Sequence, residues 1–279
     1  GHVGGATASQ LAVKSIIDFL DKEPFENIRQ ALFDAICYAN EQIFSHSTSN
    51  PELKGMGTTC TVLIAREPEI FIAHVGDSRI YLHKNRELFR LTKDHSFVQD
   101  LVDQGVINDE DAENHPRKNQ ILKALGIKEN IEPTVYTGNI HPTKGDKFLL
   151  CTDGLNGEIN DNQINKIFNQ NPDINQAGST LIKAALSAGG KDNVTIEIIE
   201  VIQSPFEKSV FPNYNPNPLI KTDPNKISDD LKITNIDEKI PTKNQSNDKK
   251  LKLIIGILSL IIVVGGATLF FNDVAEFKR

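Results

Sequence analysis

The stretch Glu69-Ile-Phe-Ile-Ala-His-Val-Gly-Asp-Ser-Arg-Ile-Tyr-Leu-His83 places a carboxylate between two runs of strand-forming residues. Its β-branched and aromatic residues predict two strands, residues 69–75 and 79–83, on either side of Asp77. A strand that passes through a core and ends in an aspartate delivers a hard oxygen ligand to the rim of a sheet. Taken alone, the Gly-Asp pair at this position also suits an ordinary turn, because both residues are favoured there for backbone reasons.

Two more aspartates occupy the same kind of position in the chain. Asp153 follows the apolar run Phe148-Leu-Leu-Cys-Thr152, and Asp192 lies in Gly190-Lys-Asp-Asn193, just before another strand-like run. If these strand ends converge with Asp77, three carboxylates meet at one place. Oxygen ligands of this kind suit Mg²⁺ or Mn²⁺. Asp77, Asp153 and Asp192 are therefore candidate metal ligands, and an ordinary turn stays the alternative at each position.

The remaining periodicity predicts further strands and several helices. Alternating or β-branched runs indicate strands, whereas apolar residues repeating every three to four positions indicate helices. A run of strands enclosed by helices predicts an α+β fold, with sheets sandwiched between helical layers. The predicted helices span residues 6–22, 25–45, 96–114, 161–169 and 173–188, and the other strands span residues 58–65, 87–91, 132–137, 147–152 and 193–202.

Composition excludes some classes of function. The net charge is −7, and no block of basic residues occurs, which argues against general nucleic-acid binding. Tryptophan is absent, so an aromatic platform for single strands is also excluded. Cys37, Cys60 and Cys151 are far apart and odd in number. They fit buried thiols in a reducing compartment, not a disulfide framework.

Five motifs occur in a fixed order along the first 202 residues. They are Gly55-Met-Gly-Thr-Thr-Cys60, Ala73-His-Val-Gly-Asp-Ser-Arg-Ile-Tyr81, Leu91-Thr-Lys-Asp-His-Ser96, Leu150-Cys-Thr-Asp-Gly-Leu155 and Gly189-Gly-Lys-Asp-Asn-Val-Thr195. The series resembles the bacterial branch of the metal-dependent Ser/Thr protein phosphatases (type 2C, or PPM). Each motif is weak alone, and the order makes the resemblance specific.

The resemblance implies a fold, a cofactor and an activity. The fold would be a four-layer α/β/β/α sandwich of two antiparallel sheets flanked by helices. Asp153 and Asp192 would bind two Mn²⁺ or Mg²⁺ ions, and Asp77 with Asp153 would form an outer site for a third. Residues 96–124 would form a mobile flap. The substrates would be phosphorylated Ser/Thr proteins, and the chain would oppose a Ser/Thr kinase.

The start of the chain resembles the end of the family's first metal loop. In the family, an aspartate that bridges the metals and an arginine that holds phosphate lie upstream of the position that Gly1 occupies. We therefore expect a phosphatase domain lacking its N-terminal strands, weak or inactive by itself, whose phosphate-binding residue is unknown. His2 is a candidate general acid or a loop residue. Arg79 is a candidate phosphate contact or a solvated strand residue, and His95 is expected to be structural.

After residue 202 the composition shifts to proline, asparagine and lysine without periodicity, which predicts a disordered linker. The segment Leu253–Phe271 carries no charge and is long enough to cross a bilayer as a helix. A buried core helix is the alternative. Lysines before the span favour a cytoplasmic phosphatase domain at the cell membrane. The predicted organisation is a domain over 1–202, a linker over 203–250, a transmembrane helix over 251–272 and a short tail over 273–279.

Three classes of function fit these features. The chain is a membrane-anchored phosphatase, a pseudophosphatase that binds phosphoproteins, or an anchored interaction protein in which the span is the working part. Three carboxylates at converging strand ends favour the enzyme, because they would repel one another without bound cations.

Overall fold

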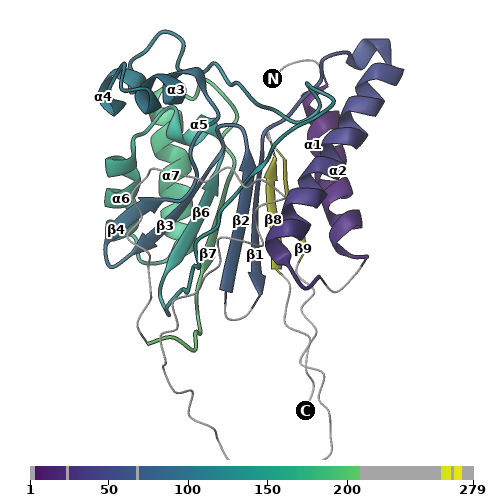
Figure 1. The fold of residues 1–279 in the computed structure, drawn as a ribbon. Helices are drawn as coiled ribbons and strands as arrows, with labels where there is room; N and C mark the ends of the chain where they lie inside the picture. The colour runs from purple at the N-terminus through teal and green to yellow at the C-terminus, as the bar shows by residue number, and fades with distance from the viewer. Residues whose placement is uncertain (1–3, 23–24, 67–68, 208–258, 265–266, 272–279) are drawn as a thin grey trace, which may run out of the picture.

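A computed structural model describes residues 4–22, 25–66, 69–207, 259–264 and 267–271 of the chain. Two β-sheets lie face to face between two layers of helices (Figure 1). All strand pairs in both sheets are antiparallel. The predicted α+β class, with two antiparallel sheets flanked by helices, is therefore confirmed.

The first two layers pack helices α1 and α2 on a sheet with the strand order β5-β2-β1-β8-β9. Their bounds are α1 Gly5–Leu20, α2 Ile28–Ser49, β1 Cys60–Arg66, β2 Glu69–Val75, β5 Thr134–Val135, β8 Ser259–Val264 and β9 Ala267–Phe271, and the short 3-10 helix η1 Pro51–Leu53 follows α2.

The other two layers pack three helices on a sheet with the strand order β4-β3-β6-β7. Two further short helices lie in the segment predicted as a flap. The bounds are β3 Arg79–Lys84, β4 Glu87–Arg90, α3 Phe97–Asp103, α4 Asp109–Glu113, β6 Lys147–Cys151, α5 Asp153–Asn156, α6 Asp161–Gln170, α7 Ile174–Ala188 and β7 Ile196–Glu200.

Alternation along the strands explains why four layers form. Val62 and Ile64 of β1 face the α1–α2 layer, whereas Leu63 between them faces the space between the sheets. In β3, Leu82 also faces that space, and Tyr81 turns to the α6–α7 side. Successive side chains of a strand point to opposite faces, so strands that are apolar on both faces must be covered twice.

Most predicted elements lie within a few residues of the observed ones, and two differ. The predicted helix over 96–114 is two short helices, because the chain turns at Gly105, whose φ of +69° lies in the left-handed region. The predicted strand over 132–137 is only Thr134–Val135. Pro133 lacks a backbone donor and therefore weakens strand pairing at that end.

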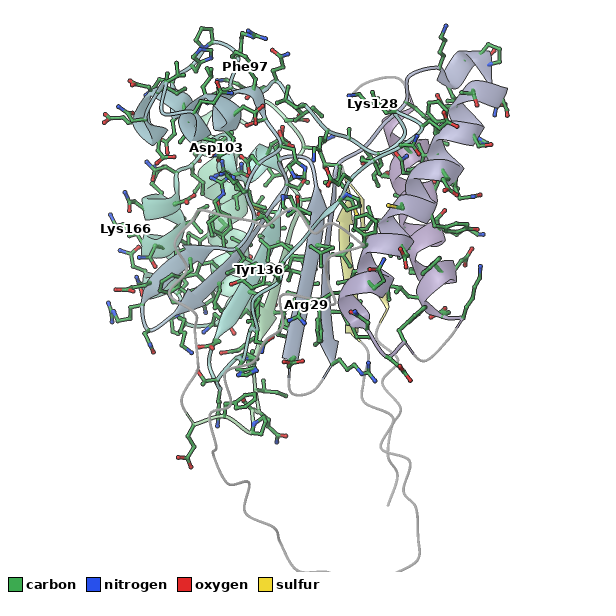
Figure 2. All side chains as sticks on the ribbon, viewed as in Figure 1. Arg29, Phe97, Asp103, Lys128, Tyr136 and Lys166 are labelled. Atoms are coloured by element: carbon green, nitrogen blue, oxygen red, sulfur yellow. The ribbon has the colours of Figure 1, made fainter. Side chains whose placement is uncertain are left out.

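The segment that follows the flap is fastened to α2. The Asn40 amide donates to the carbonyl oxygens of Lys128 (3.0 Å) and Glu129 (2.9 Å), and its oxygen accepts from Gly126 N (2.8 Å). Arg29, near the start of the same helix, donates from Nε to Tyr136 O at 3.4 Å. Figure 2 labels Lys128 beside α2, and Arg29 and Tyr136 near β2. The Asn40 bonds hold the chain on both sides of Ile127, which lines the cavity described below.

The described residues of the predicted transmembrane segment form strands and not a helix. Within Leu253–Phe271, residues 259–264 and 267–271 are strands β8 and β9, and β8 pairs with β1. The segment is rich in isoleucine and valine, and the Gly-Gly pair of its sequence is a hairpin signal. The free edge of β1 supplies backbone partners. Among the described residues, no helix is both long and apolar enough to cross a membrane.

The domain boundary also lies later than predicted. Ser204, inside the predicted linker, donates from its hydroxyl to Pro142 O at 2.6 Å. The ring of Phe206 stacks on His141 with the centroids 4.5 Å apart. The packed region therefore continues to Phe206. Residues 208–250 of the predicted linker lie outside the described residues. So do residues 251–258, 265–266 and 272 of the predicted span, and the predicted tail over 273–279.

Candidate active site

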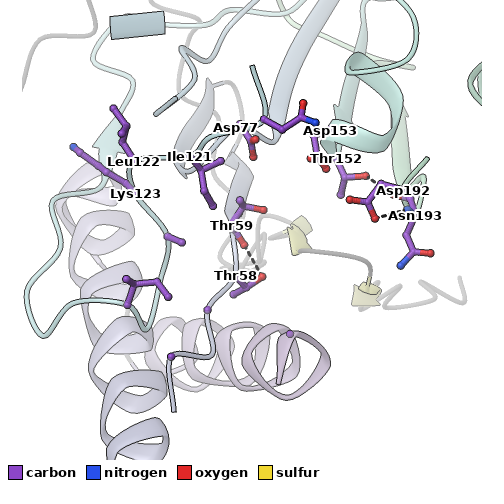
Figure 3. A pocket seen from close by; sticks show the side chains of 16 residues that line it. Thr58, Thr59, Asp77, Ile121, Leu122, Lys123, Thr152, Asp153, Asp192 and Asn193 are labelled. Carbon is purple, nitrogen blue, oxygen red and sulfur yellow. Dashed lines mark hydrogen bonds between the residues drawn. The ribbon is translucent and has the colours of Figure 1, made fainter. Parts of the chain in front are cut away.

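Asp77, Asp153 and Asp192 line one cavity of about 610 Å³ (Figure 3). They come from the turn between β2 and β3, the start of α5 and the turn before β7. Figure 3 shows the three carboxylates on one side of the cavity and the flap residues Ile121 and Leu122 on the other. The structure thus brings together the three residues predicted as metal ligands.

The turn that carries Asp77 crosses from one sheet to the other, because β2 and β3 belong to different sheets. Gly76 makes this crossing with φ of +104°, and a Cβ atom there would collide with Thr59. Thr59 Oγ1 lies 2.9 Å from Ser78 Oγ, which ties the turn to the start of β1. Only 8% of Asp77 is exposed, so its carboxyl is held at the inner wall of the cavity.

Asp153 and Asp192 are brought together by Thr152. Its hydroxyl donates to Asn193 O (3.2 Å) and accepts from Thr195 N (3.1 Å). The two turns approach so closely that a Cβ atom on the residue after Asp153 would collide with the Asn193 carbonyl, and glycine stands there. Asp192 Oδ1 accepts from Asn193 N at 2.7 Å. The glycine after Asp153 therefore allows the close backbone approach.

The carboxylates perturb one another. Burial raises the pKa of Asp77 to about 7, and the charges of Asp153 and Asp94 add to the rise. Burial also raises the pKa of Asp153, and the charge of Asp192 adds to it. Asp153 is thus coupled to both neighbours. Crowded carboxylates with raised pKa values favour binding of a cation, which would remove the repulsion.

The donor set fits divalent cations that retain water. Carboxylates bind Mg²⁺ and Mn²⁺ in combination with water molecules, and few protein ligands are required. In the ranges that the structure describes, no three His, Cys, Asp or Glu side chains are grouped to hold one ion. The carboxylates therefore suit cations held by pairs of side chains, one pair being Asp77 with Asp153 and the other Asp153 with Asp192.

Arg79 is mostly buried and does not line the cavity, so the expected solvated position is wrong and a phosphate contact stays a prediction. It donates from Nε and Nη2 to the Asp94 carboxylate at 3.0 and 2.7 Å, and Arg90 Nη2 also pairs with Asp94. Burial alone would raise the pKa of Asp94, but Arg79 and Arg90 hold it below its usual value. The cluster is a buried structural ion pair beneath the Asp77 turn.

The two candidate histidines have different outcomes. His95 is structural, as expected: burial lowers its pKa to about 2, and both ring nitrogens have hydrogen-bond partners. His2, the predicted general acid, lies outside the described residues.

Sequence reasoning missed the apolar side of the cavity. Ile121, Leu122 and Ile127 are 39%, 40% and 50% exposed, and all three line the cavity. The only signal in the sequence is that these aliphatic residues follow the polar flap helices without entering a helical or strand period. Lys123 lines the same wall, but its Nζ donates to Glu132 O at 3.3 Å.

Comparison with known proteins gives one consistent answer. A family model described as Protein phosphatase 2C matches residues 1–191. The chain is 38% identical over 202 residues to serine/threonine protein phosphatase PstP of Mycobacterium tuberculosis, which covers 72% of the chain and 38% of that relative. It is 37% identical over 204 residues to serine/threonine phosphatase stp of Listeria welshimeri, covering 72% of the chain and 80% of the relative. The chain therefore spans well under half the length of the mycobacterial relative.

Solved structures agree with this result. The crystal structure of M. tuberculosis PstP matches with a TM-score of 0.66 and 36% identity, covering 73% of this chain and 84% of that one. A structure of the PstP catalytic domain in complex with two manganese ions matches with a TM-score of 0.64, 36% identity and the same coverage. Stp1 from Staphylococcus aureus matches with a TM-score of 0.65 and 33% identity, covering 73% of this chain and 80% of that chain.

Proposed function

Because the chain belongs to the protein phosphatase 2C family, we propose that it hydrolyses phosphoserine and phosphothreonine in proteins at the cavity of Asp77, Asp153 and Asp192. The observation that carries the proposal is the convergence of these three carboxylates from turns far apart in the sequence. The family relatives are named as serine/threonine phosphatases, which supports the same reaction class.

The cofactor we propose is Mn²⁺ or Mg²⁺. Asp153 and Asp192 would hold the inner ions, and Asp77 with Asp153 an outer one, as the pairwise coupling of their pKa values favours. When bound, such ions offset the charge of a phosphoryl group and make water a stronger nucleophile near neutral pH. The PstP structure with two manganese ions supports the choice of cofactor.

The residues of this chain supply binding, orientation and exclusion of water. The Asp77 and Asp192 turns present their carboxyl groups on the same side of the cavity (Figure 3), and Thr152 holds Asp153 against the Asp192 turn. The aliphatic side chains of Ile121 and Leu122 border the same space. Donation of a proton to the leaving Ser or Thr oxygen by His2 stays a prediction, because His2 lies outside the described residues.

The apolar wall favours a peptide substrate over a small phosphorylated metabolite. A phosphoryl group near the carboxylates would leave the residues beside it close to Ile121, Leu122 and Ile127. A sugar phosphate would bury little apolar surface against these aliphatic side chains, whereas the side chains of a peptide would bury more and so bind with a more favourable free energy. Turnover of a phosphopeptide should therefore exceed that of p-nitrophenyl phosphate in kcat/KM.

A pseudophosphatase that binds phosphoproteins is the second candidate. The expectation that the chain as given is weak or inactive belongs to the enzyme and stays a prediction. Both candidates use the same cavity, and they differ in turnover. Mn²⁺-dependent release of phosphate from a phosphothreonine peptide would support the enzyme. Tight binding of that peptide without release would support the binding module.

The decisive variant is Asp153→Asn, because Asp153 is coupled to both other carboxylates. We expect it to lower Mn²⁺-dependent kcat by at least about 1000-fold, since it removes a charge from every proposed metal pair. Asp18→Asn, on the outer face of α1 with Lys14 as its partner, is the control and should keep full activity. Equal activity in both variants would overturn the proposed site.

Membrane attachment and a cytoplasmic location stay predictions. A segment paired with β1 through β8 cannot cross a bilayer at the same time, because its backbone groups are already hydrogen-bonded to the sheet. Carbonate extraction of membranes from cells that express the chain separates the two fates of residues 253–271. Retention in the pellet would support the span, and release would support the sheet.

A further inference from the structure

The segment Leu91–Ser96 stood out in the sequence, yet none of its residues lines the cavity. We propose that His95 is a positioning residue that couples the Asp77 turn to the flap (residues 96–124), so that the outer metal position and the flap are set together. The inference rests on the proposed function, because it assigns Asp77 to a metal.

One side of His95 holds the Asp77 turn. His95 N donates to Gly76 O at 2.9 Å, and Gly76 N donates to His95 Nδ1 at 3.1 Å. These two bonds close a ring between the residue before Asp77 and one histidine. Since Nδ1 accepts, the proton of the neutral imidazole lies on Nε2, which donates to Thr134 Oγ1 at 2.9 Å. The imidazole is thus a rigid spacer between the Asp77 turn and β5.

The other side of His95 holds the flap. Its carbonyl accepts from Leu122 N at 2.7 Å, and the next residue, Ser96, forms an isolated bridge with Ile121. Phe97 N donates to Gln120 O at 2.9 Å, which continues the pairing. The start and the return of the flap are therefore joined at His95, directly beside the apolar wall of the cavity.

His74 fixes the plane of the His95 ring. The two rings stack with centroids 4.6 Å apart and an interplanar angle of 18°. His74 is 2% exposed, and its Nε2 lies 2.7 Å from Lys93 O. A ring held on its face and at both nitrogens cannot move without moving Gly76. A shift of the flap should therefore reach Asp77 through one residue.

The test separates the two sides of the ring. In His95→Asn, the amide oxygen can take the place of Nδ1 and keep the bond from Gly76 N, whereas His95→Ala loses it. His83→Ala is the matched control, because His83 is also buried and stacked on an aromatic ring, with Phe168 at 5.1 Å, but lies on the α6 side. All variants are compared in the full chain, and urea denaturation gives the free energy of unfolding of each.

Amide hydrogen exchange is the first readout, since it does not depend on metal or activity. We expect His95→Ala to raise exchange at least about 10-fold both in residues 76–78 and in residues 120–124. His95→Asn should restore protection at 76–78, and His83→Ala should change neither segment. Faster exchange in only one of the two segments, or equal effects of Ala and Asn, would overturn the coupling.

Calorimetric titration with Mn²⁺ is the second readout. His95→Ala should weaken Mn²⁺ binding about 10-fold in the otherwise unchanged chain, and it should have no further effect in an Asp77→Asn background. An additive effect in that background would overturn the inference. If the unchanged chain binds no Mn²⁺ and releases no phosphate, the proposed function fails. The exchange experiment still decides the coupling in that case.

Discussion

The Asp77 turn (residues 76–78) and the Asp192 turn (residues 190–193) each deliver a carboxylate to the same cavity, and they are held in different ways. The Asp77 turn is clamped by His95 and by Thr59 through Ser78, and its carboxyl is buried. Asp192 is exposed, and its recorded hydrogen bond is to its own neighbour, Asn193. The Asp77 carboxyl is therefore positioned by the fold, whereas the Asp192 carboxyl has fewer contacts that hold it in place.

The largest expected effect comes from the ion pair beneath the Asp77 turn. Asp94→Asn removes the shared partner charge of the buried Arg79 and Arg90 guanidinium groups and leaves Arg79 the longer pair with Asp161 at 3.6 Å. The free energy of unfolding should fall by about 3–5 kcal/mol, measured in urea. Asp103→Asn, which breaks a more exposed pair with Lys93, should cost less than about 1 kcal/mol. Equal losses of unfolding free energy would contradict a larger contribution from the buried Arg79–Asp94–Arg90 cluster than from the Lys93–Asp103 pair.

The pH dependence of the metal-free chain distinguishes the buried carboxyl from the exposed one. An unfolded aspartate has a pKa near 3.8, and folded Asp77 has one of about 7. Between these values the folded state holds the extra proton, so stability is lost as the pH rises through this window. Relative to Asp77→Asn, the unchanged chain should lose roughly 2–3 kcal/mol between pH 5 and pH 8, from about 1.4 kcal/mol per unit.

The control for this experiment is Asp192→Asn, which should keep most of the pH dependence because it leaves the buried carboxyl in place. Adding Mn²⁺ should remove the loss, since a bound cation favours the ionised form. A chain whose pH dependence is unchanged by Asp77→Asn would contradict the buried position of that carboxyl.

Glycines in the two turns sharpen the comparison further. Gly76→Ala puts a Cβ atom into Thr59 at φ of +104°, whereas in Gly190→Ala the new atom finds Leu186 at 3.3 Å with φ of +56°. We expect a loss of about 2 kcal/mol for the first and about 1 kcal/mol for the second, from thermal denaturation. The reverse order would mean that the Asp77 turn is the more adaptable one.

The smallest effect is expected where the Asp192 turn meets Asp153. Thr152→Val removes the hydroxyl that links Asn193 O and Thr195 N and keeps the shape of the side chain. The cost should be about 1 kcal/mol, read from urea midpoints. Thr180, a half-buried residue of α7 whose hydroxyl donates within its own helix, gives the control Thr180→Val, which should be nearly neutral. A neutral Thr152→Val would show that glycine packing alone joins the two turns.

The sequence predicted the layers well because each layer has its own period. In β1, β2, β3 and β6, alternate apolar side chains point to opposite faces, so the sequence indicates which of them face the helices and which face the second sheet. The apolar faces of α6 and α7 indicate which side of each helix packs on the sheet. The three aspartates were also visible, since each stands directly after or before such a run.

The sequence left more than one solution open at several places. An uncharged run of isoleucine and valine suits a membrane helix and also a sheet strand, and only the open edge of β1 favours the strand. Arg79 looked free because its partner, Asp94, is fifteen positions away along the chain. The apolar wall of Ile121 and Leu122 carried no periodicity at all.

By itself, the sequence predicted the fold class and the order of the elements from local periodicity, and the order of its motifs singled out the three carboxylates. Only the tertiary structure decided which turn is rigid, which carboxyl is buried, and that His95 lies between the Asp77 turn and the flap. Those properties depend on backbone groups and side chains that meet across distant parts of the chain, and no local pattern encodes such meetings.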